Sequence, residues 1–197
     1  MEPRSATVER KTGETRVRVT LVLDGTGESQ VSTGLAFLDH MLDALSRHAG
    51  WSLTLDCQGD LHIDDHHTAE DCALTLGQAL DQALAERKGI TRFGSAYAPL
   101  DEALARAVID LSGRPWPEIH LGFRRESIGP VATENLVHFL QSFAIAARMN
   151  LHVDIVRAEN DHHRCEAAFK AVALALRAAL APHGAPNQVP STKGVLA

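Results

Sequence analysis

The chain has 197 residues, of which 45% are hydrophobic and 22% are charged. These are the proportions of an ordinary globular protein, so they exclude disordered, collagen-like and low-complexity classes. The formal net charge of −6 argues against a nucleic acid or an anionic membrane as partner, and no apolar run reaches the roughly 18 residues of a transmembrane helix.

The first half of the chain is predicted to contain strands followed by helix, strand and helix. Asp24-Gly25 interrupts a stretch of alternating apolar residues and predicts a hairpin turn. Gly50 and Gly89 are expected to end the two helices. The expected elements are strands within 5–33, a helix over 36–49, a strand over 51–56 and a helix from Asp65 to about Lys88.

The second half has the same predicted order of elements. They are strands near 94–100, 104–111 and 116–122, a helix over 132–149, a strand over 151–157 and a helix over 161–181. Residues 184–197 are rich in Gly, Pro, Asn, Ser and Thr, and they show no periodicity, so a tail is expected there.

The two halves resemble each other in sequence. When His40 is aligned with His138, the segment 65–70 falls on 161–166 and the strand 16–21 falls on 106–111. Conserved order and nearly constant spacing make chance similarity a poor explanation. We therefore expect an internal duplication.

The duplication predicts a fold class and a division of the chain. We expect an α+β fold of two half-domains, with four helices packed between two small mixed sheets. The predicted units are a first half-domain over residues 1–92, a second over 93–183 and a C-terminal tail over 184–197.

Each half carries the pattern H-H-x-x-E at the start of a predicted helix, as His66-His67 with Glu70 and His162-His163 with Glu166. Residues four apart share a helix face, whereas adjacent residues point about 100° apart. Each first histidine can therefore bind a metal ion together with its glutamate, while the second histidine faces elsewhere. One such pattern alone would be better explained by a capping carboxylate beside a solvated histidine, but the pattern occurs twice.

The repeat suggests how two metal sites are completed. Each His–Glu pair would be joined by one histidine of a preceding helix and by the remaining histidine of the other half. The expected sets are His66, Glu70, His138 and His163, and His162, Glu166, His40 and His67. Three imidazoles and one carboxylate suit Mn, Fe, Co, Ni or Zn better than Ca or Mg, and an octahedral ion would keep two positions open for chemistry.

The cysteines bear on the cellular compartment. Cys57, Cys72 and Cys165 are odd in number and form no C-x-x-C motif, so we expect reduced, buried thiols. Residues 1–10 are polar and contain no apolar core of a secretory signal. Together these features predict a cytoplasmic protein.

The motifs of the chain resemble those of the imidazoleglycerol-phosphate dehydratase family, in its form without a fused phosphatase domain. The similarity extends over most of the chain. It is carried by segments 37–41, 64–71, 110–115, 160–170 and 190–194. The resemblance implies a lyase of histidine biosynthesis that dehydrates imidazole glycerol phosphate to imidazole acetol phosphate. It also implies two Mn²⁺ ions per site that bind the substrate as an imidazolate, and a 24-subunit assembly with sites shared between subunits.

The resemblance also implies roles for individual residues. The catalytic residues would be Glu14, Glu166 and His67. The substrate-binding residues would be Glu14, His48, Arg92, Arg114, Lys170, Ser191 and Lys193, of which Arg92, Arg114, Ser191 and Lys193 would bind the phosphate.

Simpler interpretations stand beside several of these roles. Arg114 could belong to a local turn, and residues 191–193 could be part of a disordered tail. Glu14 could be an exposed hairpin carboxylate, Lys170 could pair with Glu166 one helical turn earlier, and His48 could interact with a helix C-terminus. Two other functions also fit the motifs from residues alone. One is a storage or structural metal protein with closed coordination, and the other is a di-metal hydrolase acting on an ester.

Overall fold

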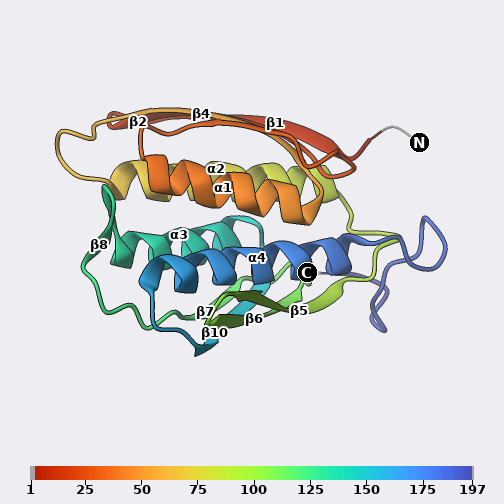
Figure 1. Cartoon of the computed structure of the whole chain (residues 1–197). Helices are drawn as coiled ribbons and strands as arrows, with labels where there is room; N and C mark the ends of the chain where they lie inside the picture. Colours follow the sequence, from red (N-terminus) through yellow and green to blue (C-terminus); the bar gives the residue numbers. More distant parts are fainter. Residues whose placement is uncertain (1–2, 197) are drawn as a thin grey trace.

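The computed structural model describes residues 3–196, which form four layers in the order sheet, helices, helices, sheet (Figure 1). Alternation of apolar and polar residues gives each sheet a buried face; in one strand Val17, Val19 and Leu21 are buried, whereas Arg16 and Arg18 are exposed. The first half contains β1 (Ser5–Lys11), β2 (Thr15–Val22), β3 (Ser29–Ser32), α1 (Ala36–Ala49), β4 (Ser52–Gly59) and α2 (His66–Leu84).

The second half repeats this order with a small additional hairpin. It contains β5 (Phe93–Leu100), β6 (Ala103–Asp110), β7 (Trp116–His120), β8 (Ser127–Ile128), β9 (Val131–Ala132), α3 (Thr133–Ala146), β10 (Asn150–Arg157) and α4 (Asp161–Leu180). Beyond α4 the described residues form turns, bends and an isolated bridge between Pro182 and Ile90, with no further helix or strand among them.

The two four-stranded sheets have equivalent topologies. Their strand orders are β1-β2-β4-β3 and β5-β6-β10-β7. In both, the first two pairings are antiparallel and the last is parallel. The α+β class, the duplication and the packing of four helices between two mixed sheets are confirmed. The exact boundaries at 92/93 and 183/184 stay a prediction.

Strand pairing corrects the alignment of the two halves. Leu21 pairs with Leu53, and Ile109 pairs with Leu151, the counterpart of Leu53. Leu21 therefore corresponds to Ile109, and the predicted match of 16–21 with 106–111 was wrong by two residues. A slip of two residues keeps every side chain on the same sheet face, so alternation alone could not reveal it.

The hairpin predicted at Asp24-Gly25 was also wrong. The hairpin turn lies at Thr12–Thr15, between β1 and β2, and β4 lies between β2 and β3 in the sheet. The role of Gly25 is a close backbone approach, because a Cβ there would lie 2.2 Å from the backbone nitrogen of Ser52.

The helix ends agree with the sequence in α1 but not in α2. Gly50, with φ of 77°, ends α1 as predicted. The second helix ends at Leu84, four residues before the predicted end, where Ala85 takes a left-handed φ of 48°. The buried guanidinium of Arg87 explains this, because it leaves the helix path to bind the carbonyls of Ala147 and Arg148 just past α3. α3 is likewise shorter than the predicted 132–149.

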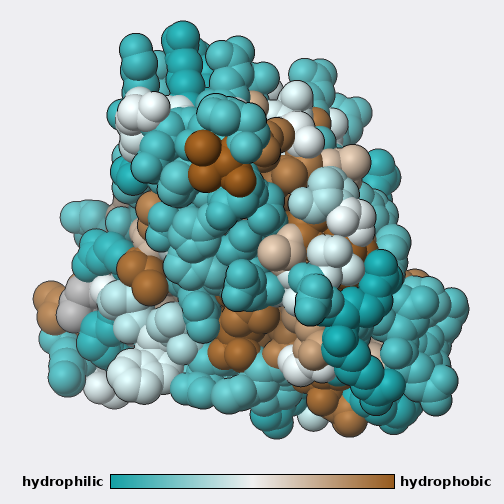
Figure 2. Space-filling model, turned by 90° about the vertical axis from the view of Figure 1, so that its left-hand side faces the viewer, coloured by the Kyte–Doolittle hydropathy of each residue, from teal (hydrophilic) through white to brown (hydrophobic). Residues whose placement is uncertain are grey.

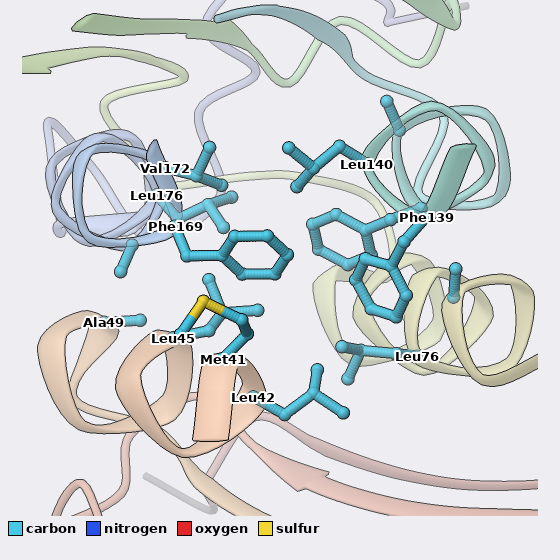
Figure 3. Close-up of a cluster of buried hydrophobic side chains, with 14 of the residues drawn as sticks. Met41, Leu42, Leu45, Ala49, Leu76, Phe139, Leu140, Phe169, Val172 and Leu176 are labelled. Carbon is cyan, nitrogen blue, oxygen red and sulfur yellow. The ribbon is translucent and has the colours of Figure 1, made fainter. Parts of the chain in front are cut away.

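The core lies where the four helices meet (Figure 3). α1 packs against α4, and α2 packs against α3, so each pair joins the two halves. Phe139 of α3 approaches Phe169 of α4 with ring centroids 5.9 Å apart, and both side chains are fully buried. Around them lie Met41, Leu42, Leu45, Leu76, Leu140, Val172 and Leu176.

All four helices begin at the same end of the molecule, on the left in Figure 1. Figure 2 views this end directly and shows a mostly hydrophilic surface with separate hydrophobic patches. Within residues 3–196, the helices are too short or too polar to cross a membrane.

A glycine sets the distance between α2 and α3. A Cβ at Gly77 would lie 2.7 Å from the Ala146 Cβ and from the Phe143 carbonyl oxygen. Alanine normally favours a helix by about 1 kcal/mol over glycine, whereas overpacking costs roughly 1–3 kcal/mol. We therefore expect Gly77→Ala to lower the free energy of unfolding in urea, with Gln78→Ala on the same helix as a near-neutral control. Equal stability of both variants would contradict the close packing.

Candidate metal centres and phosphate pocket

The first cluster joins α2 to α3. The Nε2 atom of His138 lies 3.0 Å from Oε1 of Glu70, and Nε2 of His66 lies 4.0 Å from Oε2 of the same carboxylate. The two imidazole rings stack with centroids 4.9 Å apart. The Nδ1 atom of His66 lies 2.9 Å from the side-chain oxygen of Asn135, which fixes the ring and leaves Nε2 to the cluster.

The second cluster joins α4 to α1. The Nε2 atoms of His40 and His162 lie 3.1 and 3.3 Å from Oε2 of Glu166. The other carboxylate oxygen accepts a hydrogen bond of 2.6 Å from Lys170. Burial raises the pKa of Glu166, but hydrogen bonds from Lys170 and His40 outweigh it, and the pKa falls below its usual value.

Both clusters fit a first-row divalent ion. In each, two imidazole nitrogens and one carboxylate oxygen lie within 4.8 Å of one another. Such an arrangement of lone pairs is favourable only with a proton or a cation between them. The mixed nitrogen and oxygen donors suit a first-row ion, and three protein ligands leave coordination positions open.

The structure brings together three of the four ligands predicted for each site. As the helix geometry predicted, His67 and His163 face away from the clusters of their own chain. The Nδ1 atom of His67 lies 3.1 Å from Asp60, and that of His163 lies 2.7 Å from Glu102. These carboxylates raise the pKa of both histidines.

The carboxylate–histidine contacts resemble the hydrogen bonds that orient metal-binding histidines in other proteins. A carboxylate at Nδ1 fixes the ring and increases the basicity of Nε2, the nitrogen that remains for an ion. The hydrogen bond from His163, together with one from the Asn160 backbone, lowers the pKa of Glu102 to about 2. The rings of His67 and His163 are thus oriented as those of metal-binding histidines are, although neither residue belongs to a cluster within this chain.

Sequence reasoning missed three residues of this arrangement, namely Asp60, Glu102 and Asn135. One signal was available for Glu102. With the corrected alignment of the halves, it falls on Glu14, because both lie at the tip of the first hairpin of their half. The two-residue slip in the predicted alignment concealed this match.

The four residues predicted to bind phosphate line one cavity of about 180 Å³, together with Thr192, Val195 and Leu196. The guanidinium of Arg92 binds both carboxylate oxygens of Asp110, at 2.6 and 3.0 Å. It also donates to the Pro190 carbonyl at 2.9 Å. Arg92 therefore attaches the C-terminal tail to the second half-domain, and the tail closes the cavity.

For the remaining predicted residues, the contacts agree partly with the simpler interpretations given by the sequence. Lys170 makes the ion pair with Glu166 that its spacing allowed. Glu14 is half-exposed at the hairpin tip, yet its Oε1 lies 3.6 Å from Nε2 of His67. His48 is in the last turn of α1, where burial and then the charge of Lys170 lower its pKa.

The chain matches a known protein family. The model described as imidazoleglycerol-phosphate dehydratase matches residues 33–176. The proteins of that name from Torulaspora delbrueckii and Saccharomyces cerevisiae are 52% and 50% identical, and the alignments cover 100% of both chains. A longer one from Phytophthora nicotianae is 59% identical, and the match covers 98% of this chain but 43% of that protein.

Two solved structures have the same fold. Imidazoleglycerol-phosphate dehydratase from Staphylococcus aureus is 36% identical with a TM-score of 0.82, and the match covers 91% of this chain and 99% of that one. The enzyme from Pyrococcus furiosus, solved in complex with (S)-C348, is 33% identical with a TM-score of 0.82, and the match covers 96% and 100%.

The separation of the clusters predicts the metal content of variants. We expect about two divalent ions per chain, one for each cluster, and a loss of about one ion in His66→Ala and in His162→Ala. The control is His62→Ala, an exposed histidine outside both clusters, which should keep both ions. Elemental analysis after dialysis measures the content. An unchanged content in both cluster variants would exclude these clusters as metal sites.

Proposed function

Because the chain belongs to the imidazoleglycerol-phosphate dehydratase family, and so dehydrates imidazole glycerol phosphate to imidazole acetol phosphate in histidine biosynthesis, we propose that it does so at its two His–Glu clusters, each with one Mn²⁺ ion. The observation that carries this proposal is that three potential metal-binding side chains converge in each of two equivalent clusters. When bound, the two ions would favour the imidazolate form of the substrate ring.

We propose that the fourth ligand of each site comes from a neighbouring subunit. His163 would complete the cluster of Glu70, and His67 would complete the cluster of Glu166. Support comes from their carboxylate-fixed rings, which lie outside both clusters of the chain. Each site then lies between subunits of a homo-oligomer, for which we propose 24 subunits.

Glu14 is the proposed acid–base residue. Its carboxylate is half-exposed, so a substrate can reach it, and it lies beside Nε2 of His67. The carbon next to the ring loses its hydroxyl, and the proton to be removed is on the following carbon of the substrate. That proton would be transferred to Glu14 close to the proposed metal site. Glu166 and His67, also proposed as catalytic, contribute as metal ligands in this arrangement.

The cavity at the C-terminal tail is the proposed phosphate site. Arg114 and Lys193 supply positive charge, Ser191 supplies a hydroxyl, and Arg92 fixes the wall formed by the tail. We place His48 and Lys170 among the substrate contacts as well. The open coordination and this cation-lined cavity favour a dehydratase over a storage protein. Three buried free thiols support a cytoplasmic location.

The proposed role of Glu14 predicts a loss of turnover without a loss of metal. Glu14→Gln keeps the size of the side chain but removes its basicity, so kcat should fall about a hundredfold or more. Metal content should equal that of the wild type. Glu9→Gln, an exposed change on the adjacent strand, serves as the control. Normal turnover of Glu14→Gln would assign the proton transfer to another group.

The phosphate cavity predicts weaker substrate binding. Arg114→Ala and Lys193→Ala each remove a charge-assisted contact of about 1.5–3 kcal/mol, so KM should rise by roughly ten- to a hundredfold. Arg106→Ala removes an exposed arginine from the outer sheet face and should leave KM unchanged. Inorganic phosphate should compete with substrate in the wild type. Unchanged KM values in both cavity variants would argue against this phosphate site.

Sites shared between subunits predict that assembly depends on metal. Chelation should shift the particle to a smaller species, because an ion that bridges two subunits stabilises their contact by mass action. Adding Mn²⁺ should restore both the larger particle and the activity. Light scattering gives the mass. A particle of constant mass that loses its ions and its activity would mean that other contacts alone hold the subunits together.

A further inference from the structure

A buried carboxylate on α2 anchors the hairpin that carries Glu14. Asp71 is only 4% exposed. One of its oxygens accepts a hydrogen bond of 2.7 Å from Nε of Arg10. The other accepts a short hydrogen bond from the Thr15 hydroxyl and a longer one of 3.5 Å from the Thr12 hydroxyl. The carboxylate therefore contacts the hairpin on both of its strands.

The contact continues from Thr12 to the backbone of Glu14. The Thr12 hydroxyl accepts hydrogen bonds from the backbone N–H of Glu14 at 3.1 Å and of Thr15 at 3.0 Å. A hydroxyl group can donate one hydrogen bond and accept two. The Thr12 hydroxyl proton faces the Thr15 hydroxyl at 3.3 Å and the Asp71 carboxylate at 3.5 Å, so these contacts together define one conformation of the hairpin tip.

The same helix also holds a metal ligand. Asp71 follows Glu70, and adjacent helical residues point about 100° apart. Glu70 thus contacts His138 of α3, while Asp71 contacts the hairpin. Because both side chains extend from one rigid turn of α2, this turn fixes the position of Glu14 relative to the first metal cluster.

The second half lacks this anchor. Glu166 is followed by Ala167 at the position that corresponds to Asp71. Its hairpin tip is held by the carboxylate of Glu102, which binds His163 and the backbone N–H groups of Glu159 and Asn160. In that half the tip glutamate is therefore fully engaged in structural contacts.

In the first half, other residues make the equivalent structural contacts. Asp60 binds the ring of His67, and Asp71 together with Thr12 holds the tip. The carboxylate of Glu14 is therefore not needed to orient the histidine ring or to hold the hairpin tip, whereas Glu102 does both in the second half. This difference between two duplicated hairpins indicates that Asp71 is tied to the chemistry of Glu14, and not only to the fold.

We propose that Asp71 is a positioning residue, which holds Glu14 in its reactive place through the hydroxyl group of Thr12. The proposal rests on the acid–base role of Glu14 given above. Asp71 is buried and its oxygens bind the hairpin, so its removal should change turnover through Glu14 alone. A displacement of a reacting group by about 1 Å can lower a rate by up to a hundredfold.

A double-mutant cycle tests the proposal. Asp71→Asn should lower kcat by about tenfold to a hundredfold, with KM and metal content near the wild-type values. In a Glu14→Gln background the same substitution should change kcat by less than about twofold, because the group it positions is already absent. An equal fold-loss in both backgrounds would overturn the proposal and leave Asp71 a purely structural residue.

A second pair of variants guards against misfolding of Asp71→Asn. Thr12→Ser keeps the hydroxyl and should retain the wild-type kcat, whereas Thr12→Val should lower kcat as Asp71→Asn does. Thr12→Ser and Thr12→Val with the same activity would contradict a path through this hydroxyl. Glu9→Gln, on the exposed face of the same hairpin, is the matched surface control.

Hydrogen exchange separates this inference from the role of Glu14. The amides of Glu14 and Thr15 should exchange faster in Asp71→Asn and Thr12→Val, while those within α2 keep their protection. Mass spectrometry of hairpin peptides measures the rates. If Glu14→Gln stays fully active, the acid–base role fails, and faster exchange would still show that Asp71 holds the tip. Unchanged exchange would overturn that as well.

Discussion

The angle between adjacent residues on a helix determines how the candidate sites are built. Two neighbouring histidines diverge by about 100°, so they cannot bind one ion together. One of each pair joins the glutamate four residues later, as His66 does with Glu70. The other meets a carboxylate from a different element, as His67 meets Asp60. Three-ligand clusters and outward-facing, carboxylate-bound histidines both follow from this one constraint.

The same constraint determines where the adjacent carboxylates of Glu70 and Asp71 point. Glu70 and Asp71 are adjacent, and they point to α3 and to the first hairpin respectively. A single helical turn thus connects a candidate metal cluster, the contact between the halves and the hairpin that carries Glu14. Gly77, two turns later, allows α3 to approach α2 closely enough for His138 to reach the cluster.

Local patterns predicted much of this arrangement. Periodicity gave the four helices and most of the strands, and the repeated histidines gave both three-donor clusters. The features that these patterns did not predict depend on tertiary contacts. Arg87 ends α2 early because its guanidinium binds carbonyls after α3, a contact between residues about sixty positions apart. The order of strands also depends on the parallel pairing of β3, whose short polar sequence gives little signal.

The alignment of the two halves explains why some residues of the candidate sites escaped prediction. Glu102 could be recognised only once Leu21 was matched with Ile109, and strand register supplied that match. Asp60 and Asn135 have no equivalent in the other half, so no repeat could identify them. Their roles depend on which histidine ring lies nearby, and this is a property of the folded chain.

Each cluster takes its His–Glu pair from one half of the chain and its third donor from the other, so neither half alone contains a complete cluster. The two arrangements are equivalent under exchange of the halves. A polypeptide of half the length, paired with a second copy of itself about a two-fold axis, would therefore contain both clusters at one self-complementary interface. Joining two such copies end to end would preserve that symmetry and free each copy to diverge, as the hairpins of Glu14 and Glu102 have done.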